Sequence, residues 1–199
     1  MSTKKAYHHG DLRQVLLNEA AALLRDEGES GLSMRALAAR AGVSRTAPYH
    51  HFRDKRELLC AVAEEGFKRF VSVLTVEEEQ LSERRLGQFV RDYLDFALNN
   101  SEYYDLMFGS QLWKSEGITD TLLDEAHGSF RFYVEQVRMW QQRGLINERT
   151  DVLRYSQVSW GTLHGLSRLL IDGIYLDREA MGPMCDQAAS LFWRELSAN

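Results

Sequence analysis

Hydrophobic residues recur at helical spacing along most of the chain, and no useful length alternates with the period of two that indicates a strand. The pattern predicts amphipathic helices over residues 11–25, 33–41, 45–52, 54–74, 86–98, 102–108, 118–143, 151–171 and 178–196. Only two prolines are present in the whole chain. We therefore expect an all-α fold of about nine helices, in which an N-terminal three-helix helix-turn-helix domain precedes a C-terminal helical bundle.

Residues 32–55, LSMRALAARAGVSRTAPYHHFRDK, have an order that packing alone does not explain. Ser33 suits an N-cap, and Gly42 suits the left-handed residue that ends a helix. Ser44 can then cap the next helix, while the small Ala38 lets the two helices approach closely. The pattern predicts a helix-turn-helix whose second helix covers residues 45–52. Because proline is tolerated only in a first helical turn, Pro48 allows this helix to start a residue or two later.

The motif exposes hydrogen-bond donors and aromatic side chains of the kind that contact DNA. Arg45, Thr46 and His50 are candidates for base edges in the major groove. Ser33 and Arg35 begin a helix, where backbone N–H groups and the helix dipole favour a phosphate, although Ser33 can serve simply as a cap. His51 is expected to pack under Phe52. The full set of DNA-binding candidates is Ser33, Arg35, Ser44, Arg45, Thr46, Tyr49, His50 and Lys55.

Two segments resemble a known family. Residues 7–28, YHHGDLRQVLLNEAAALLRDEG, and 32–67, LSMRALAARAGVSRTAPYHHFRDKRELLCAVAEEGF, resemble the N-terminal domain of the TetR/AcrR family of bacterial transcription regulators. The later stretch WGTLHG, with Trp160, His164 and Gly165, is similar to the Trp-His-Gly pattern of one C-terminal subclass. The resemblance implies a ligand-responsive, homodimeric repressor of DNA operators. It also implies that Tyr49 and Lys55 act as phosphate clamps.

The expected domains follow from this reading. Residues 1–56 form the DNA-binding domain, and the helix over 54–75 connects it to a ligand-binding and dimerisation domain over 76–199. Lys4, Lys5, Tyr7, His8 and His9 form either a basic arm that touches DNA or a frayed terminus. In the mechanism that the resemblance implies, a ligand in the second domain changes the spacing of the two DNA-binding heads through the connecting helix.

The second domain is rich in aromatic residues, most of which are expected to form its core. The resemblance implies a cavity enclosed by the middle helices, and residues with polar tips or adaptable side chains are candidates to line it. His164 is expected to be a hydrogen-bonded packing residue rather than a metal ligand or a base. The candidate ligand-binding residues are Tyr93, Tyr103, Met107, Phe130, Tyr133, Trp160 and His164.

The last two helices are expected to join two chains, because one helix-turn-helix reads only a few base pairs and affinity comes from two half-sites. Their small and adaptable apolar side chains suit a four-helix interface. Alternatively, these side chains complete the core of a single chain. The candidates are Leu163, Ser167, Leu170, Ile171, Met181, Met184, Ala188, Leu191 and Phe192.

Charge is distributed unevenly although the chain as a whole carries −5. Residues 1–56 have a net charge of +4 and residues 57–199 of −9, an asymmetry expected of a DNA-binding head on an acidic body, or of chance variation. Cys60 and Cys185 have no ligand partners at metal-site spacing, so we expect buried, reduced thiols and no metal.

No membrane span or secretory signal is visible, so a cytoplasmic location is expected. No catalytic nucleophile, carboxylate pair or phosphate-binding glycine loop is recognisable, so an enzyme, with or without a cofactor, is not expected. The remaining alternatives are a TetR-like activator and a small-molecule-binding or interaction protein whose helix-turn-helix no longer reads DNA.

Overall fold

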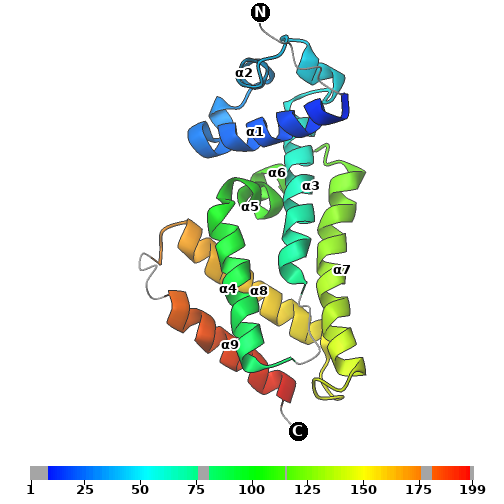
Figure 1. Cartoon of the computed structure of the whole chain (residues 1–199), viewed down its shortest axis with the longest axis vertical. Coiled ribbons are helices and arrows are strands. Elements are labelled where there is room, and N and C mark those ends of the chain that lie inside the picture. The colour runs from blue at the N-terminus through cyan, green and yellow to red at the C-terminus, as the bar shows by residue number, and fades with distance from the viewer. Residues whose placement is uncertain (1–8, 76–80, 115, 176–180, 198–199) are drawn as a thin grey trace, which may run out of the picture. The chain divides into compact units, whose positions relative to one another are not determined.

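The computed structural model describes residues 9–75, 81–114, 116–175 and 181–197, and within these ranges all regular structure is helical (Figure 1). The predicted all-α fold is confirmed. The predicted basic arm before His9 lies outside the described residues. The elements are α1 (His9–Gly31), α2 (Met34–Arg40), the 3-10 helix η1 (Ala47–His50), α3 (Lys55–Leu74), α4 (Glu83–Asn99), α5 (Ser101–Phe108), α6 (Ser110–Lys114), α7 (Asp120–Gln142), α8 (Val152–Ile171) and α9 (Met181–Ser197).

Side-chain caps fix the beginnings of several helices. The backbone N–H of Glu57 donates to the carboxylate of Asp54 at 2.9 Å at the start of α3, and the Glu57 carboxylate accepts from the N–H of Arg53 at 2.8 Å. The hydrogen bond from the Glu57 backbone is the main cause that lowers the pKa of Asp54. Asp151 caps α8 in the same way, accepting from the N–H of Arg154 at 3.1 Å.

Two helical boundaries differ from those predicted. The helix α1 begins at His9, two residues before the predicted start at residue 11. At its other end the helical course is broken at Gly28, whose φ of 69° is accessible to glycine at little cost. Residues 110–117 were predicted as a loop, yet Ser110–Lys114 form α6 because Leu112 is buried and Trp113 donates from Nε1 to the Met107 carbonyl at 2.8 Å.

The chain divides into two compact units. The first unit comprises Met1–Phe67 with Glu102–Glu125, and the second comprises Lys68–Ser101 with Ala126–Asn199. The boundary expected between residues 56 and 76 therefore falls inside α3, and a segment expected in the second domain groups with the first.

Polar contacts explain why residues 102–125 belong to the first unit. The buried carboxylate of Glu64 on α3 accepts from the hydroxyls of Thr119 at 3.0 Å and Thr121 at 2.5 Å. The buried Glu102 pairs with Arg25 of α1 at 3.1 Å. A buried carboxylate is costly unless it is paired or hydrogen-bonded, so these contacts hold the segment on α1 and α3.

In the second unit, α4 packs against both α8 and α9 (Figure 1). Its buried face carries Leu86, Phe89, Val90, Tyr93, Leu94 and Ala97, the helical spacing predicted from the sequence. Arg91 of α4 also forms an ion pair with Asp186 of α9 at 2.7 Å. Cys185, on the same helix, is buried, as is Cys60 in the first unit.

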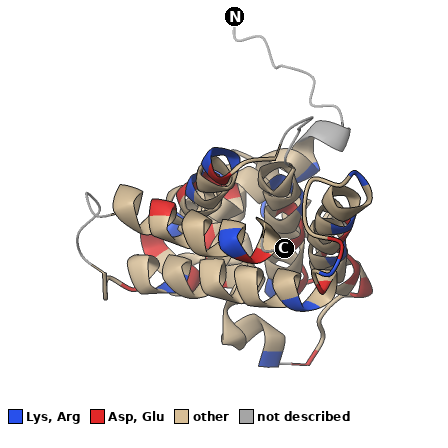
Figure 2. Ribbon diagram, turned by 90° about the horizontal axis from the view of Figure 1, so that it is seen from below, with Lys and Arg blue, Asp and Glu red and all other residues tan. Residues whose placement is uncertain are grey.

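In the view of Figure 2, charged positions of both signs are scattered over the helices. Among the described helices, none is long and apolar enough to cross a membrane.

Candidate nucleic-acid interface

The corner of the predicted helix-turn-helix has the geometry that its sequence suggested. Ser33 is extended and its hydroxyl accepts from the N–H of Ala36 at 3.1 Å, which caps α2. At the other end Gly42 has φ 67°. The N–H of Val43 donates to the Ala38 carbonyl at 3.0 Å and that of Gly42 donates to the Ala39 carbonyl at 3.2 Å. These two bonds define a Schellman motif, which satisfies the last carbonyls of α2 while the chain turns.

The second helix of the motif is shorter than predicted. Regular structure covers Ala47–His50 as a single 3-10 turn, in place of residues 45–52. Pro48 is the physical reason, since it lacks an N–H and its ring excludes a helical turn that precedes it. Phe52 makes an α-type bond from its N–H to the Pro48 carbonyl at 2.9 Å, so the turn ends at a buried ring.

Ser44 does not cap this turn, for which the N-cap is Thr46 without a side-chain bond. The hydroxyls of Ser44 and Thr46 instead lie 3.2 Å apart, within hydrogen-bonding distance of each other. His51 is half-buried, with its ring centroid 6.3 Å from that of Phe52, which fits the packing role expected for it.

The corner leaves most of the predicted DNA contacts accessible to solvent. Tyr49 is 55% exposed, which is unusual for a large aromatic side chain in a protein surface. In the part of the chain that the structure describes, Arg35, Arg45 and His50 are exposed and form no ion pair with a carboxylate. Three cationic or protonatable groups and a phenol are therefore free to contact a ligand of negative charge.

Lys55 has a second role that the sequence did not indicate. Its ammonium group donates to the carbonyl of Glu29 at 2.6 Å, which ties the start of α3 to the end of α1 just after the break at Gly28. Lys55 is half-buried, and an ammonium group has two further donors that a phosphate can use.

Arg40 and Arg13 brace the motif on α1. The guanidinium of Arg40 bridges Glu19 at 3.0 Å and Asp26 at 2.6 Å, so it is committed within the protein. The guanidinium of Arg13 lies 5.4 Å from the centre of the Phe52 ring, a cation–π contact. Sequence reasoning missed both contacts, since nothing local marks which arginine on a helix meets a neighbouring element.

The turn at Gly42 gives a test of backbone strain. A Cβ at Gly42 meets nothing within 4 Å, so Gly42→Ala costs only the left-handed conformation, about 1 kcal/mol of unfolding free energy. Gly161 lies inside α8 and also has open space around it, so Gly161→Ala should stabilise by about 0.5–1 kcal/mol. Urea unfolding of both variants measures this, and shifts of the same sign would contradict the explanation.

Five of the seven candidate ligand residues lie in the second unit, where four aromatic rings surround Trp160. Ring centroids of Phe70, Tyr93, Phe130 and Tyr133 are 5.6, 6.1, 5.5 and 5.6 Å from that of Trp160. Tyr133 is buried and shares a hydrogen bond of 2.9 Å with the hydroxyl of Ser159. Burial raises the pKa of Tyr133 to about 12, so its phenol stays protonated.

His164 is half-buried near this cluster on α8, and its pKa lies below the ordinary value because of burial and the charge of Arg168. It is therefore uncharged at neutral pH. The remaining candidates, Tyr103 and Met107, are buried in the first unit, where Met107 Sδ lies 2.7 Å from the position that a Cβ on Gly66 would take. Gly66 is thus required for close packing of α5 on α3.

The structure places most of the predicted dimer residues in the interior of the single chain. Leu163, Ser167, Leu170, Ala188 and Phe192 are 0–8% exposed, and Ser167 donates to the carbonyl of Leu163 at 2.9 Å. These five match the alternative in which the last helices complete the core of one chain. Ile171, Met181 and Met184 are half-buried, and Leu191 is 53% exposed.

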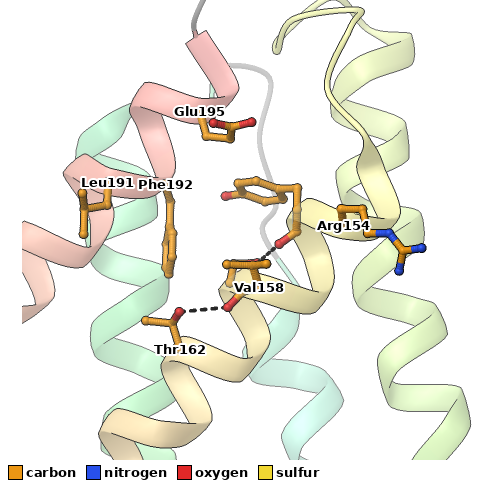
Figure 3. Close-up of a pocket in the computed structure, with 8 residues that line it drawn as sticks. Arg154, Val158, Thr162, Leu191, Phe192 and Glu195 are labelled. Atoms are coloured by element: carbon orange, nitrogen blue, oxygen red, sulfur yellow. Dashed lines mark hydrogen bonds between the residues drawn. The ribbon is translucent and has the colours of Figure 1, made fainter.

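Other residues of α8 and α9 form an accessible apolar face. Val158 is 67% exposed, Leu191 is 53% exposed, and a cavity of about 370 Å³ opens beside them (Figure 3). The cavity is lined by Arg154, Tyr155, Val158, Ser159, Thr162, Leu191, Phe192 and Glu195. Of these, the sequence analysis singled out only Leu191 and Phe192. The sequence contained one signal for this face, since every fourth position places Arg154, Val158 and Thr162 on the same side of α8. A single valine between polar residues is too weak a signal to predict an apolar face.

The first helix of the motif is capped and ends at a glycine, and the turn that follows exposes cationic and aromatic side chains. Together with a second, helical unit in the same chain, this motif is typical of a DNA-binding regulatory protein. Residues 16–62 match the model of the bacterial regulatory proteins of the tetR family, and residues 86–191 match that of the tetracyclin repressor-like C-terminal domain. The second match alone covers more than half of the chain. The chain belongs to the tetR family of transcription regulators.

Individual relatives agree with this assignment. The chain is 48% identical over 52 residues to the class C tetracycline repressor protein of Escherichia coli, covering 26% of this chain and 24% of that protein. It is 27% identical over 180 residues to the HTH-type transcriptional activator FasR of Mycolicibacterium smegmatis, covering 76% of this chain and 82% of that one. The chain thus spans about a quarter of one relative and four-fifths of the other.

A solved structure from Rhodococcus sp. RHA1, described as a protein with unknown function, superposes with a TM-score of 0.81 at 34% identity, covering 98% of this chain and 100% of that one. The fold that positions the motif is therefore one found in an experimental structure over essentially its full length.

Proposed function

We propose that this chain is a repressor that binds an operator as a homodimer and is released from it by a small molecule bound in the second unit. The observation that carries the DNA-binding part is the Schellman turn at Gly42, which leaves Arg45, Tyr49 and His50 exposed. Arg45 supplies a fork of donors for a guanine edge, and the Tyr49 hydroxyl suits a phosphate.

Pairing is supported by the exposed apolar face of α8 and α9. A single motif contacts few base pairs, so specific binding requires two of them at a spacing matched to the grooves. Val158 and Leu191 are the largest exposed apolar side chains beside the cavity, and a second copy of the chain removes them from water. Arg154 and Glu195 lie at the rim of this face on different helices (Figure 3), so a two-fold arrangement can bring opposite charges together.

Release by a ligand is supported by the aromatic cluster around Trp160. The resemblance of WGTLHG to the Trp-His-Gly subclass favours the same region, where an apolar ligand would displace rings that now pack against Trp160 and would have the Tyr133 hydroxyl as a polar contact. The sign of regulation remains part of the proposal, since the relatives include a protein named as a repressor and one named as an activator.

Binding to the DNA upstream of its own gene tests the proposal. We expect affinity to fall steeply as salt rises from 50 to 200 mM, because phosphate contacts release counterions. Tyr49→Ala should lower affinity about tenfold for every DNA sequence alike. Lys55→Ala should lower it similarly and should also loosen the head, since it removes the bond to the Glu29 carbonyl.

Tyr175→Ala is the matched control, since Tyr175 is 46% exposed and follows α8 in the second unit. It should leave DNA affinity unchanged. Absence of binding at low salt by the unchanged chain would favour the alternative, an interaction or small-molecule-binding protein with a degenerate motif. Binding that persists unchanged in Tyr49→Ala would rule out the phosphate role of that residue.

A further inference from the structure

One arginine of the helix-turn-helix is bound by two carboxylates of its own chain. Arg40 is the last residue of α2, and its guanidinium donates from Nε to Glu19 at 3.0 Å and from Nη2 to Asp26 at 2.6 Å. Both carboxylates belong to α1 and lie about two helical turns apart on it. A guanidinium is a rigid, planar fork, so its two bonds fix the direction of the contact as well as its length.

The remaining contacts of α2 leave its orientation on α1 weakly determined. The helix packs against α1 and η1, and its buried residues are Met34, Leu37 and Ala38. Contacts between apolar side chains are non-directional, so they hold the helix in place without fixing its tilt. The two bonds of Arg40 are directional and lie at the end of α2 that leads into the turn, so they set that tilt.

The tilt of α2 matters because both groups of predicted DNA contacts depend on it. Ser33 and Arg35 lie at the start of the helix. Gly42, directly after its C-cap, begins the turn that leads to Arg45 and Tyr49. The groups of a binding site must be held within about 0.5 Å and 10–20° of the productive geometry. A change in the tilt of α2 therefore displaces both groups from the phosphates and bases that they would contact.

We propose that Glu19 and Asp26, although negatively charged, strengthen DNA binding by holding Arg40, which acts as a positioning residue and not as a phosphate contact. The proposal rests on the DNA-binding part of the function proposed above. The three side chains are 33–51% exposed, so the bridge contributes modestly to folding stability. Its loss should leave a folded head in which α2 no longer has a single orientation.

Removal of both carboxylates separates positioning from electrostatics, because the two effects have opposite signs. A chain with Glu19→Ala and Asp26→Ala loses two negative charges, which by electrostatics alone raises its affinity for the DNA upstream of its gene. If the carboxylates position Arg40, affinity should instead fall about fivefold for each head that binds. Alanine favours the helix, so α1 should be kept. Circular dichroism and thermal unfolding check the fold.

Glu27→Ala is the matched control. Glu27 is an exposed carboxylate of the same helix and, in the part of the chain that the structure describes, forms no ion pair. Its removal takes a negative charge from the head without touching Arg40, so DNA affinity should not fall.

The salt dependence of binding gives a second, independent measurement. Arg40→Ala should also lower affinity about fivefold per head, but it should leave the slope of log affinity against log salt concentration unchanged, since no phosphate contact is lost. Arg35→Ala is the comparison, because loss of a phosphate contact should reduce that slope by about one for each head.

The inference is overturned, while DNA binding stands, if removal of both carboxylates raises affinity or leaves it unchanged. A reduced salt slope in Arg40→Ala would also overturn it, since Arg40 would then contact a phosphate itself. If the unchanged chain does not bind DNA at low salt, the proposed function fails and the inference fails with it.

Discussion

Replacing Trp160 by alanine is expected to lower the free energy of unfolding by about 3 kcal/mol, the largest single loss that we predict for the second unit. Trp160 contacts four aromatic rings from α3, α4 and α7, and no smaller side chain reaches all of them. Its removal leaves a void that rigid rings cannot close. Urea unfolding followed by circular dichroism measures the loss.

Trp193→Ala is the matched comparison. Trp193 is likewise half-buried in the second unit, but among the described residues its ring meets no other aromatic ring. We expect a loss of about 1 kcal/mol for this variant, typical of a partly buried side chain. Equal losses in the two variants would show that exposure, and not the ring cluster around Trp160, sets the stability of this region.

Replacing Val158 by aspartate is expected to abolish pairing at concentrations where the unchanged chain is paired, and to weaken operator binding at least a hundredfold. Val158 is 67% exposed in one chain, so the substitution costs the monomer little. In a two-fold pair it buries two carboxylates without partners, which is strongly unfavourable. Size-exclusion chromatography with light scattering gives the mass, and DNA titration gives the affinity.

The control for this variant is Ile174→Asp, which places the same charge at a position that is 64% exposed but does not line the cavity. It should remain paired and bind DNA normally. If the Val158→Asp chain still has the mass of a pair, the interface between two chains does not lie on this face. That result would leave the assignment of the helix-turn-helix unchanged. We expect DNA binding to weaken because pairing is lost. A variant that loses DNA binding but still pairs would therefore also contradict the prediction.

The helix-turn-helix was predictable because its signals are local. The Ser33 cap and the Gly42 turn each follow from the conformational preference of one residue and its immediate neighbours, and the structure has both. The later start of the second helix, at Ala47, agrees with the effect expected of Pro48, whereas its end was predicted wrongly at Phe52 and lies at His50. Because the turn at Gly42 was predicted correctly, the exposure of Arg45 and Tyr49, which come directly after it, was predicted correctly as well.

The last two helices were harder to interpret. Leu163, Ser167 and Ala188 have the small, apolar character of an interface, yet they are buried against the rest of their own unit. Helical periodicity gives the apolar face of α8 but not which neighbour covers it. Val158 stands between polar residues and gives no periodic signal, although it is exposed beside the cavity.

The sequence by itself determined the helical class of the chain, the corner that presents its reading turn and the family to which it belongs. The helical class and the corner depend on local backbone preferences and on the spacing of residues along one helix, whereas the family was indicated by the resemblance of two segments to its members. Only the tertiary structure decided that residues 102–125 group with the N-terminal head, that Lys55 holds the Glu29 carbonyl, and that the Tyr155 phenol is buried without a partner. Each of these depends on which residues distant in the sequence come into contact, and periodicity along a single helix carries no information on that.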